Sequence, residues 1–228
     1  MSNSRARRST RHPSGVQLFR RRARSEHGGR RADWRRRPSR TLTSVSEDSG
    51  RKYVIPDDPA DRPVRTRRAV RVIVVGPDDR VLLFEDSDPG IEGVTWWVTP
   101  GGGMDPGETE RTTAVREMAE ETGYVLTEDE LVGPLATRYA VHGYSDQVLE
   151  QQETFYLVRV AAFEIDISAH TDEEQITLQG HRWWSRAEIE AGEAWIWPEQ
   201  LLELWDRAGA PGLPPLELGR QEESTVPV

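Results

Sequence analysis

The sequence contains no cysteine, and this absence excludes disulfide bonds, thiolate zinc sites and cysteine nucleophiles. Long hydrophobic runs are also missing. The longest aliphatic or aromatic stretches, such as 72–75, span about four residues, whereas a membrane-spanning helix needs about 20. No apolar segment typical of a secretory signal lies near the start, so we expect a cytoplasmic protein. Only five histidines are present, and no two are spaced four residues apart, which argues against a histidine-rich metal site.

Negative charge dominates the chain, but its distribution is uneven. The 228 residues contain 30 Lys and Arg against 39 Asp and Glu, a net charge of −9. Residues 1–46 hold 14 Arg and two acids, a net charge of +12, which leaves −21 on the remainder. An acidic body repels nucleic acid and attracts divalent cations. We therefore expect neither a nucleic acid nor a membrane as the partner of the folded part.

The N-terminal segment, residues 1–60, shows no apolar periodicity and is rich in Arg and Ser, so we predict that it is disordered. Such a segment buries too little apolar surface to offset the entropy lost on ordering. Two other interpretations stay open: a start assigned too early, with the true start near Val54, and an arginine-rich arm that binds nucleic acid. The composition also resembles an organelle transit peptide.

Apolar patterning and turn residues predict an α+β domain over 61–210 and a loose tail over 211–228. The expected extended segments and their connections are strands at 68–75, 81–85, 95–99, 131–144, 153–163 and 182–184, a polar connection at 145–152, an acidic loop at 171–175 and a short strand at 176–178. The expected helices are 109–122, 186–190 and 198–207. Gly123 is expected to end the first helix, and Ser185 with Glu188 to form a capping box for the second.

A cluster of glutamates marks the first of these helices. Segment 101–124 reads GGGMDPGETERTTAVREMAEETGY. At about 100° per residue, Glu117, Glu120 and Glu121 share one helix face, while the apolar residues lie on another. The three carboxylates repel one another, and a hard divalent cation, which prefers carboxylate oxygens, would remove that repulsion. Glutamates alone are more typical of a solvated helix face, so the interpretation depends on the residues that precede them.

A glycine-rich loop precedes this helix. Residues 101–103 are all glycine, which lets the backbone approach a ligand closely. Pro106 and Gly107 predict a turn that places Glu108 at the helix start, where the helix dipole favours a carboxylate. Arg116 lies eight residues after Glu108, about two helical turns, so we expect the pair to brace the loop against the helix.

Loop and helix together resemble the Nudix box, written G-x5-E-x7-R-E-U-x-E-E-x-G-U, where U is a bulky aliphatic residue. The fixed positions correspond to Gly102, Glu108, Arg116 and Gly123, together with the three glutamates of the helix face. Tyr124 is the one departure, because the family has an aliphatic residue there. Seven fixed residues at fixed spacing make a chance match very improbable.

The resemblance extends over about residues 65–208. It implies an α/β/α sandwich around a mixed β-sheet, and hydrolysis of a nucleoside diphosphate linked to another group, with Mg²⁺ or Mn²⁺ as cofactor. It also implies roles for the box residues: Glu117 and Glu121 as metal ligands, Glu120 as a further ligand or base, the carbonyl of Gly102 as another ligand, and Glu108 and Arg116 as residues that orient the site. Phosphoanhydride hydrolysis needs neutralised phosphate charge and an activated water, which such a site supplies.

Residues outside the box complete the expected site. The resemblance implies one additional carboxylate, and the candidates are Glu150, Glu153 and the acidic run 172–174. For substrate binding the sequence offers Trp97, Tyr139 and Glu153. The adjacent pairs 96–97 and 183–184 are tryptophans in expected strands, where one ring of each pair can face the core and the other a cleft that stacks a base. Core packing is the favoured interpretation of these rings.

The function expected from these residues is that of a metal-dependent pyrophosphohydrolase with a nucleotide-derived small molecule as partner. The alternative is a non-catalytic module that senses a nucleotide, with the basic arm on RNA. Glu117, Glu120 and Glu121 favour the enzyme, because a sensor needs no complete set of metal-binding carboxylates. The oligomeric state, a homodimer included, is left open.

Overall fold

The computed structural model describes residues 53–210 and 212–228, and the predicted disorder of residues 1–52 lies outside them. The helices are η1 (Pro59–Asp61), α1 (Glu110–Thr122), η2 (Glu128–Glu130), α2 (Asp172–Thr177), α3 (Arg186–Ala191) and α4 (Leu201–Arg207). The strands are β1 (Val64–Val75), β2 (Arg80–Ser87), β3 (Thr95–Val98), β4 (Val132–Gly143), β5 (Val148–Arg159), β6 (Leu178–Ser185), β7 (Ile196–Trp197) and β8 (Leu216–Glu222). Within the described residues, no helix is both long and apolar enough to cross a membrane.

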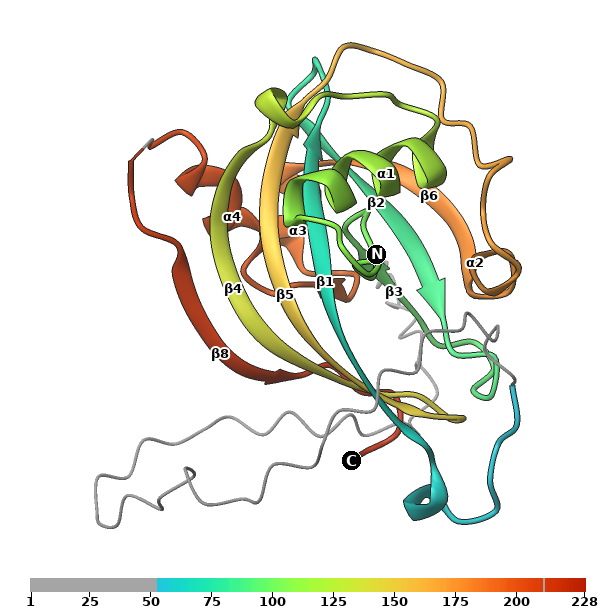
Figure 1. The fold of residues 1–228 in the computed structure, drawn as a ribbon. Coiled ribbons are helices and arrows are strands. Elements are labelled where there is room, and N and C mark those ends of the chain that lie inside the picture. Colours follow the sequence, from blue (N-terminus) through green and yellow to red (C-terminus); the bar gives the residue numbers. More distant parts are fainter. Residues whose placement is uncertain (1–52, 211) are drawn as a thin grey trace, which may run out of the picture. The chain divides into compact units, whose positions relative to one another are not determined.

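The strands of the described residues form one mixed sheet in the order β7-β3-β2-β1-β5-β4-β8, with β6 beside β2 (Figure 1). β1 runs parallel to β5 along its whole length, and β4 is antiparallel to β5. β1 pairs with β2 only at Val75 and Val81. The rest of that edge of β1 receives the glycine loop instead: the N–H groups of Val70 and Val72 donate to the carbonyls of Gly102 and Pro100, at 3.0 and 2.8 Å.

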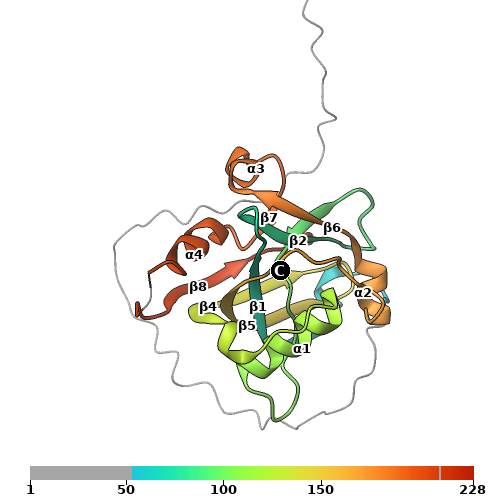
Figure 2. The same cartoon turned by 90° about the horizontal axis from the view of Figure 1, so that it is seen from above.

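The core lies on both faces of this sheet. Along β1 the side chains alternate, as in any strand. Val70, Val72 and Val74 pack with α1 on one face, and Ile73 and Val75 pack with α4 on the other. Figure 2 shows α1 and α4 on opposite sides of the strands. The predicted α+β class, with an α/β/α sandwich around a mixed sheet, is confirmed.

Local capping explains where α1 begins and ends. The hydroxyl of Thr109 accepts a hydrogen bond from the N–H of Thr112 at 3.1 Å, and Thr112 returns a bond to the N–H of Thr109 at 2.8 Å. Gly123 ends the helix at φ 71°, in the left-handed region that glycine adopts without strain. The predicted helix end and the predicted capping box of Ser185 and Glu188 are both confirmed.

Two strands begin earlier in the chain than the sequence predicted. β1 starts at Val64 and not at 68, and β5 starts at Val148 and not at 153, so the predicted polar connection 145–152 is largely strand. The reason is their mutual pairing, which begins at Val64 and Val148. Residues 150–152 in this part of β5 are polar, and one of them, Gln151, is completely buried. Because a buried strand is predicted from apolar residues, a polar residue at this position leads the sequence pattern to miss the start of β5.

The region after β5 also differs from prediction. The acidic stretch 171–175, expected to be a loop, mostly belongs to α2, because Thr171 caps the helix by accepting from the N–H of Glu174 at 3.3 Å. Residues 176–177, expected to be strand, are the end of that helix. The last helix starts at Leu201 and not at 198, because Pro198 belongs to a turn in which its carbonyl accepts from the N–H of Leu201 at 3.1 Å.

Both ends of the domain are more ordered than predicted. The tail 211–228, expected to be loose, contains β8, which pairs in parallel with β4. Beyond β8, the hydroxyl of Thr225 donates to Asp88 at 2.7 Å, and Arg62 donates to the carbonyl of Pro227 at 2.6 Å. Pro59–Asp61 forms η1 within the segment expected to be disordered through residue 60. Sheet pairing across more than 70 residues, which no local pattern contains, orders the C-terminal end.

Candidate metal centre and active site

Two of the predicted glutamates project from α1 into the interior. Glu117 and Glu121 are both buried, each with 6% of its surface exposed. An oxygen of Glu121 accepts a hydrogen bond from the N–H of Gly101 at 2.7 Å, so the glycine loop fixes the position of this side chain. A Cβ added to Gly102 would lie 2.7 Å from the Glu117 carboxylate, so a larger residue there would displace that carboxylate. Loop and helix therefore contact each other at the two carboxylates.

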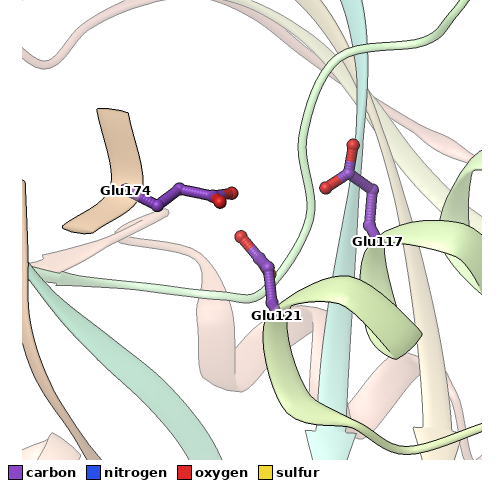
Figure 3. Close-up of side chains that lie close together, drawn as sticks. All are labelled: Glu117, Glu121 and Glu174. Carbon is purple, nitrogen blue, oxygen red and sulfur yellow. The ribbon is translucent and has the colours of Figure 1, made fainter. Parts of the chain in front are cut away.

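A third carboxylate comes from α2. One oxygen each of Glu117, Glu121 and Glu174 lies within 4.8 Å of the others, and Figure 3 shows the three side chains pointing toward one another. Glu174 belongs to the acidic run 172–174, which is one of the three sequence candidates for the additional carboxylate, beside Glu150 and Glu153. A carboxylate oxygen of Glu174 accepts from the N–H of Thr171 at 2.7 Å, which fixes the side chain to the start of α2.

The electrostatics of this group favour a cation. Burial raises the pKa of Glu117 to about 6, although Arg116 opposes the shift. Burial and the neighbouring Glu117 and Glu174 raise the pKa of Glu121 well above its usual range. Burial destabilises both carboxyls as anions, and the positive charge of Arg116 at Glu117 and of Arg71 at Glu121 only partly offsets it. Three carboxylates are the hard oxygen donors that Mg²⁺ and Mn²⁺ prefer, so the residues present fit such an ion.

Arg116 joins the glycine loop to the glutamates of α1 through five hydrogen bonds. Its Nε and Nη2 donate to Glu108 at 2.8 and 3.0 Å, and Nη2 also donates to the carbonyl of Gly103 at 2.8 Å. Nη1 donates to Glu117 and to Glu120, both at 2.8 Å. The hydrogen bond from Arg116 lowers the pKa of Glu108 to about 2, against the effect of burial. The contact expected from the eight-residue spacing is present, and it joins the loop to the helix.

Two predicted ligands lie differently from the buried pair. Glu120 is outside the group of three, because its side chain is 46% exposed and is paired with Arg116. The carbonyl of Gly102, the other predicted ligand, accepts from the N–H of Val70 at 3.0 Å. A carbonyl oxygen has two lone pairs, so this bond leaves one free for another partner.

The residues suggested for substrate binding are scattered. Tyr139 is on β4, and its hydroxyl donates to Glu150 at 2.7 Å. Glu153 is completely buried and forms ion pairs with Arg71 and Arg138. Neither Glu150 nor Glu153 belongs to the group of three carboxylates.

The adjacent tryptophans do not divide into one core ring and one cleft ring in both pairs. Trp183 and Trp184 pack into the cores on the two opposite faces of the sheet. Trp96 is fully buried. Trp97 packs edge-to-face on Trp184, with ring centroids 5.0 Å apart, and also lines a surface cavity of about 310 Å³ together with Trp195. All four rings therefore pack against the core, and of the four only Trp97 also lines that cavity.

Arg71 is the residue of this region that sequence reasoning missed. It lies on β1, and its Nη1 donates to the carbonyls of Gly101 and Thr99 at 2.9 and 3.4 Å. No local signal marks it, because it is one arginine among several in an expected strand. Its partners come from positions 28 to 82 residues away along the chain.

Comparison with known proteins gives a consistent result. The family model for the NUDIX domain matches residues 65–205. The uncharacterized Nudix hydrolase YvcI of Bacillus subtilis is 42% identical over 60 residues, which cover 26% of this chain and 35% of that protein. RNA pyrophosphohydrolases of Legionella pneumophila (strain Corby) and Erythrobacter litoralis are 31% and 33% identical. Those matches cover 43% and 49% of this chain, and 58% and 73% of the relatives, so the chain spans less than two thirds of two of these three proteins.

Proposed function

Because this chain belongs to the Nudix family, as its match to the NUDIX domain over residues 65–205 shows, we propose that it is a metal-dependent pyrophosphohydrolase. The reaction proposed is hydrolysis of a phosphoanhydride in a nucleoside diphosphate linked to another group. One observation carries the proposal: Glu117, Glu121 and Glu174 bring three carboxylate oxygens within 4.8 Å of one another beside a glycine loop. That arrangement is costly when fully ionised, and a divalent cation would offset the repulsion between the carboxylates.

The proposed ligands of Mg²⁺ or Mn²⁺ are the carboxylates of this group, with the carbonyl of Gly102 and with Glu120 as further candidates. When bound, such an ion neutralises phosphate charge and lowers the pKa of a water molecule. Burial of Glu117 and Glu121 supports their assignment as ligands, because burial destabilises both anions and the guanidinium of Arg116 beside Glu117 offsets this only in part.

The remaining box residues receive catalytic roles in this proposal. In the hydrolysis, the oxygen of a water bonds to phosphorus, the anhydride P–O bond breaks, and the proton of the water goes to a carboxylate. Glu120 suits the role of base, because its side chain is 46% exposed and only one of its oxygens is bonded to Arg116. Arg116 and Glu108 hold the loop and the helix together and so keep Glu117 and Glu120 in place.

The test is a panel of substrates incubated with the full chain. It comprises nucleoside triphosphates, ADP-ribose, dinucleotide cofactors, dinucleoside polyphosphates, capped RNA and 5′-triphosphorylated RNA. The last is included because several relatives, those of Legionella pneumophila and Erythrobacter litoralis among them, are named RNA pyrophosphohydrolases. Each is assayed with Mg²⁺, with Mn²⁺ and with a chelator, and product release is measured. Cleavage of one class that the chelator abolishes is the expected result.

Absence of turnover across the panel, with Mn²⁺ bound and the fold intact, would contradict the proposal and favour a nucleotide sensor. A nucleotide-derived small molecule is the proposed partner. The cytoplasmic location stays a prediction from the sequence, and the state of assembly stays open. The arginine-rich arm lies outside the described residues, and comparing RNA affinity of the full chain with that of a chain lacking residues 1–50 would test it.

A further inference from the structure

Arg71 occupies an unusual place between the sheet and the glycine loop. Its side chain is 15% exposed, and its Nε donates to the fully buried Glu153 on β5 at 2.9 Å. Its Nη1 points the other way and donates to the carbonyl of Gly101 at 2.9 Å, with Thr99 at 3.4 Å. One guanidinium therefore joins a strand of the sheet to the backbone of the loop.

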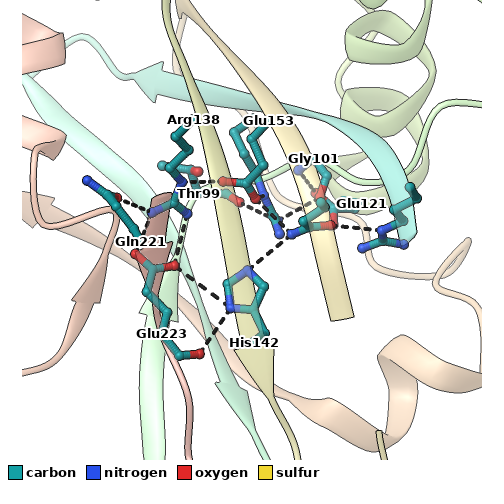
Figure 4. A network of polar contacts seen from close by, with 11 residues as sticks. Thr99, Gly101, Glu121, Arg138, His142, Glu153, Gln221 and Glu223 are labelled. Carbon is teal, nitrogen blue, oxygen red and sulfur yellow. Dashed lines mark hydrogen bonds and ion pairs between the residues drawn. The ribbon is translucent and has the colours of Figure 1, made fainter. Parts of the chain in front are cut away.

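The same glycine also contacts the carboxylate group. Gly101, whose carbonyl accepts from Arg71, donates its own N–H to Glu121 at 2.7 Å (Figure 4). The backbone of Gly101 is at φ +125°, and a Cβ there would lie 2.1 Å from the carbonyl oxygen of Val70. Glycine allows the loop to lie this close to β1. The path from Glu153 to Glu121 thus consists of hydrogen bonds of 2.9, 2.9 and 2.7 Å.

We infer that Arg71, held by Glu153, is a positioning residue that orients Glu121 through the backbone of Gly101 and thereby sets the affinity of the carboxylate group for a divalent cation. The inference rests on the proposed function and deepens it. Replacing a residue that is hydrogen-bonded to a metal ligand and orients it typically lowers metal affinity or activity by about 10- to 100-fold.

Arg138 provides a matched control, because it holds the same Glu153 without reaching the loop. It is 5% exposed, its Nε pairs with the second oxygen of Glu153, and its other nitrogens donate to Glu223 and Gln221 (Figure 4). Both arginines are mostly buried, and both contact Glu153. Only Arg71 contacts Gly101. A purely structural role predicts similar consequences for both, whereas positioning predicts a difference.

The experiment compares the variants Arg71→Lys and Arg138→Lys in the full chain. Lysine keeps the charge, but its single ammonium lacks the fork that holds Glu153 and Gly101 together. Mn²⁺ affinity is measured by calorimetry well below the melting temperature, beside kcat, KM and thermal stability. We expect Arg71→Lys to weaken Mn²⁺ binding by about tenfold and to lower kcat more than it raises KM. Arg138→Lys should lose stability while its Mn²⁺ affinity stays within about twofold of the parent.

A second variant protects the test against loss of folding. Glu153→Gln keeps the size of the side chain and releases the ionic hold on Arg71, so it should weaken Mn²⁺ binding in the same direction. Unchanged Mn²⁺ affinity in whichever of Arg71→Lys and Glu153→Gln folds would overturn the positioning inference, and the hydrolase proposal would stand if the parent still cleaves its substrate. Equal loss in Arg138→Lys would also overturn it. A parent chain that binds no Mn²⁺ would overturn both.

Discussion

Two groups of buried glutamates lie close to β1, and they differ in the positive charge around them. At the first, Glu117 and Glu121 meet Glu174, and burial raises the pKa of Glu117 to about 6. At the second, burial acts on Glu153 in the same direction, yet Arg138 and Arg71 hold its pKa at about 2. Glu117 and Glu153 are the same residue type and are both buried. The number of nearby guanidiniums decides whether a carboxylate is a closed structural element or a group suited to an external cation.

The largest expected effect comes from Glu121→Gln. Because this variant removes one of three ligand carboxylates, Mn²⁺ binding and kcat should both fall, the latter by about 1000-fold. The fold should be retained, because the amide still accepts the N–H of Gly101 and a repulsive buried charge is removed. Turnover and Mn²⁺ calorimetry on the same preparation check this.

Glu120→Gln tests whether Glu120, beside the first group, is a general base or a metal ligand. A base that is not a ligand should lose about 100-fold in kcat while the protein keeps its Mn²⁺ affinity. If Mn²⁺ affinity falls with kcat, Glu120 is a ligand and the base lies elsewhere. Near-normal turnover in both glutamate variants contradicts the catalytic assignment altogether.

Substitutions at the second group should change the free energy of unfolding. Arg138→Met leaves Glu223 without its guanidinium and Glu153 with one instead of two, at a cost of about 3–5 kcal/mol in the free energy of unfolding. Urea denaturation measures this value. Arg159→Gln is the control, because its ion pair with Asp79 is mostly exposed and should contribute no more than about 1 kcal/mol. Equal effects of the two substitutions would show that burial of the ion pair has no energetic consequence.

The pH dependence of stability separates the two groups with a smaller effect. The pKa of Glu153, about 2, lies below its ordinary 4.5, so its stabilising contribution is present above pH 4.5 and lost as pH falls toward 2. The pKa of Glu117, about 6, lies above 4.5, so its contribution is present below pH 4.5 and lost as pH rises through 6. For Glu153 the change is on the order of 3 kcal/mol.

Unfolding of the chelator-treated chain at a series of pH values gives the measurement. Glu153→Gln should flatten the acidic side of the profile, and Glu117→Gln the side between pH 4.5 and 6. Saturating Mn²⁺ should also abolish the loss above pH 4.5, because a cation binds the ionised form. A profile that none of these changes alters would contradict the charge comparison.

Local sequence predicted the part of the site that one helix and its loop contain. The spacing of Glu117 and Glu121 places both on one face of α1, and the eight-position separation of Glu108 and Arg116 allows the contact at 2.8 Å. Gly123 ended the helix as expected. Each of these depends on helical periodicity or on a cap, which are properties of neighbouring residues.

Contacts between distant segments escaped prediction. Glu174 could be named only as one acid in a run, because the turn that brings α2 to α1 has no signature of its own. The polar start of β5 and the strand β8 form because partner strands pair with them. A polar residue such as Gln151 is a poor strand signal until its buried partners are known.

The sequence by itself therefore determined the family, the glycine loop and the glutamate face of α1, because their residues lie within 24 consecutive positions and helix periodicity sets the face of α1. Only the tertiary structure decided which acids form the group of three and which are neutralised. Arg71 meets Glu153 from 82 residues away, and Arg138 meets Glu223 from 85. The electrostatic state of a buried carboxylate depends on the charges packed against it, and strand pairing brings those charges together.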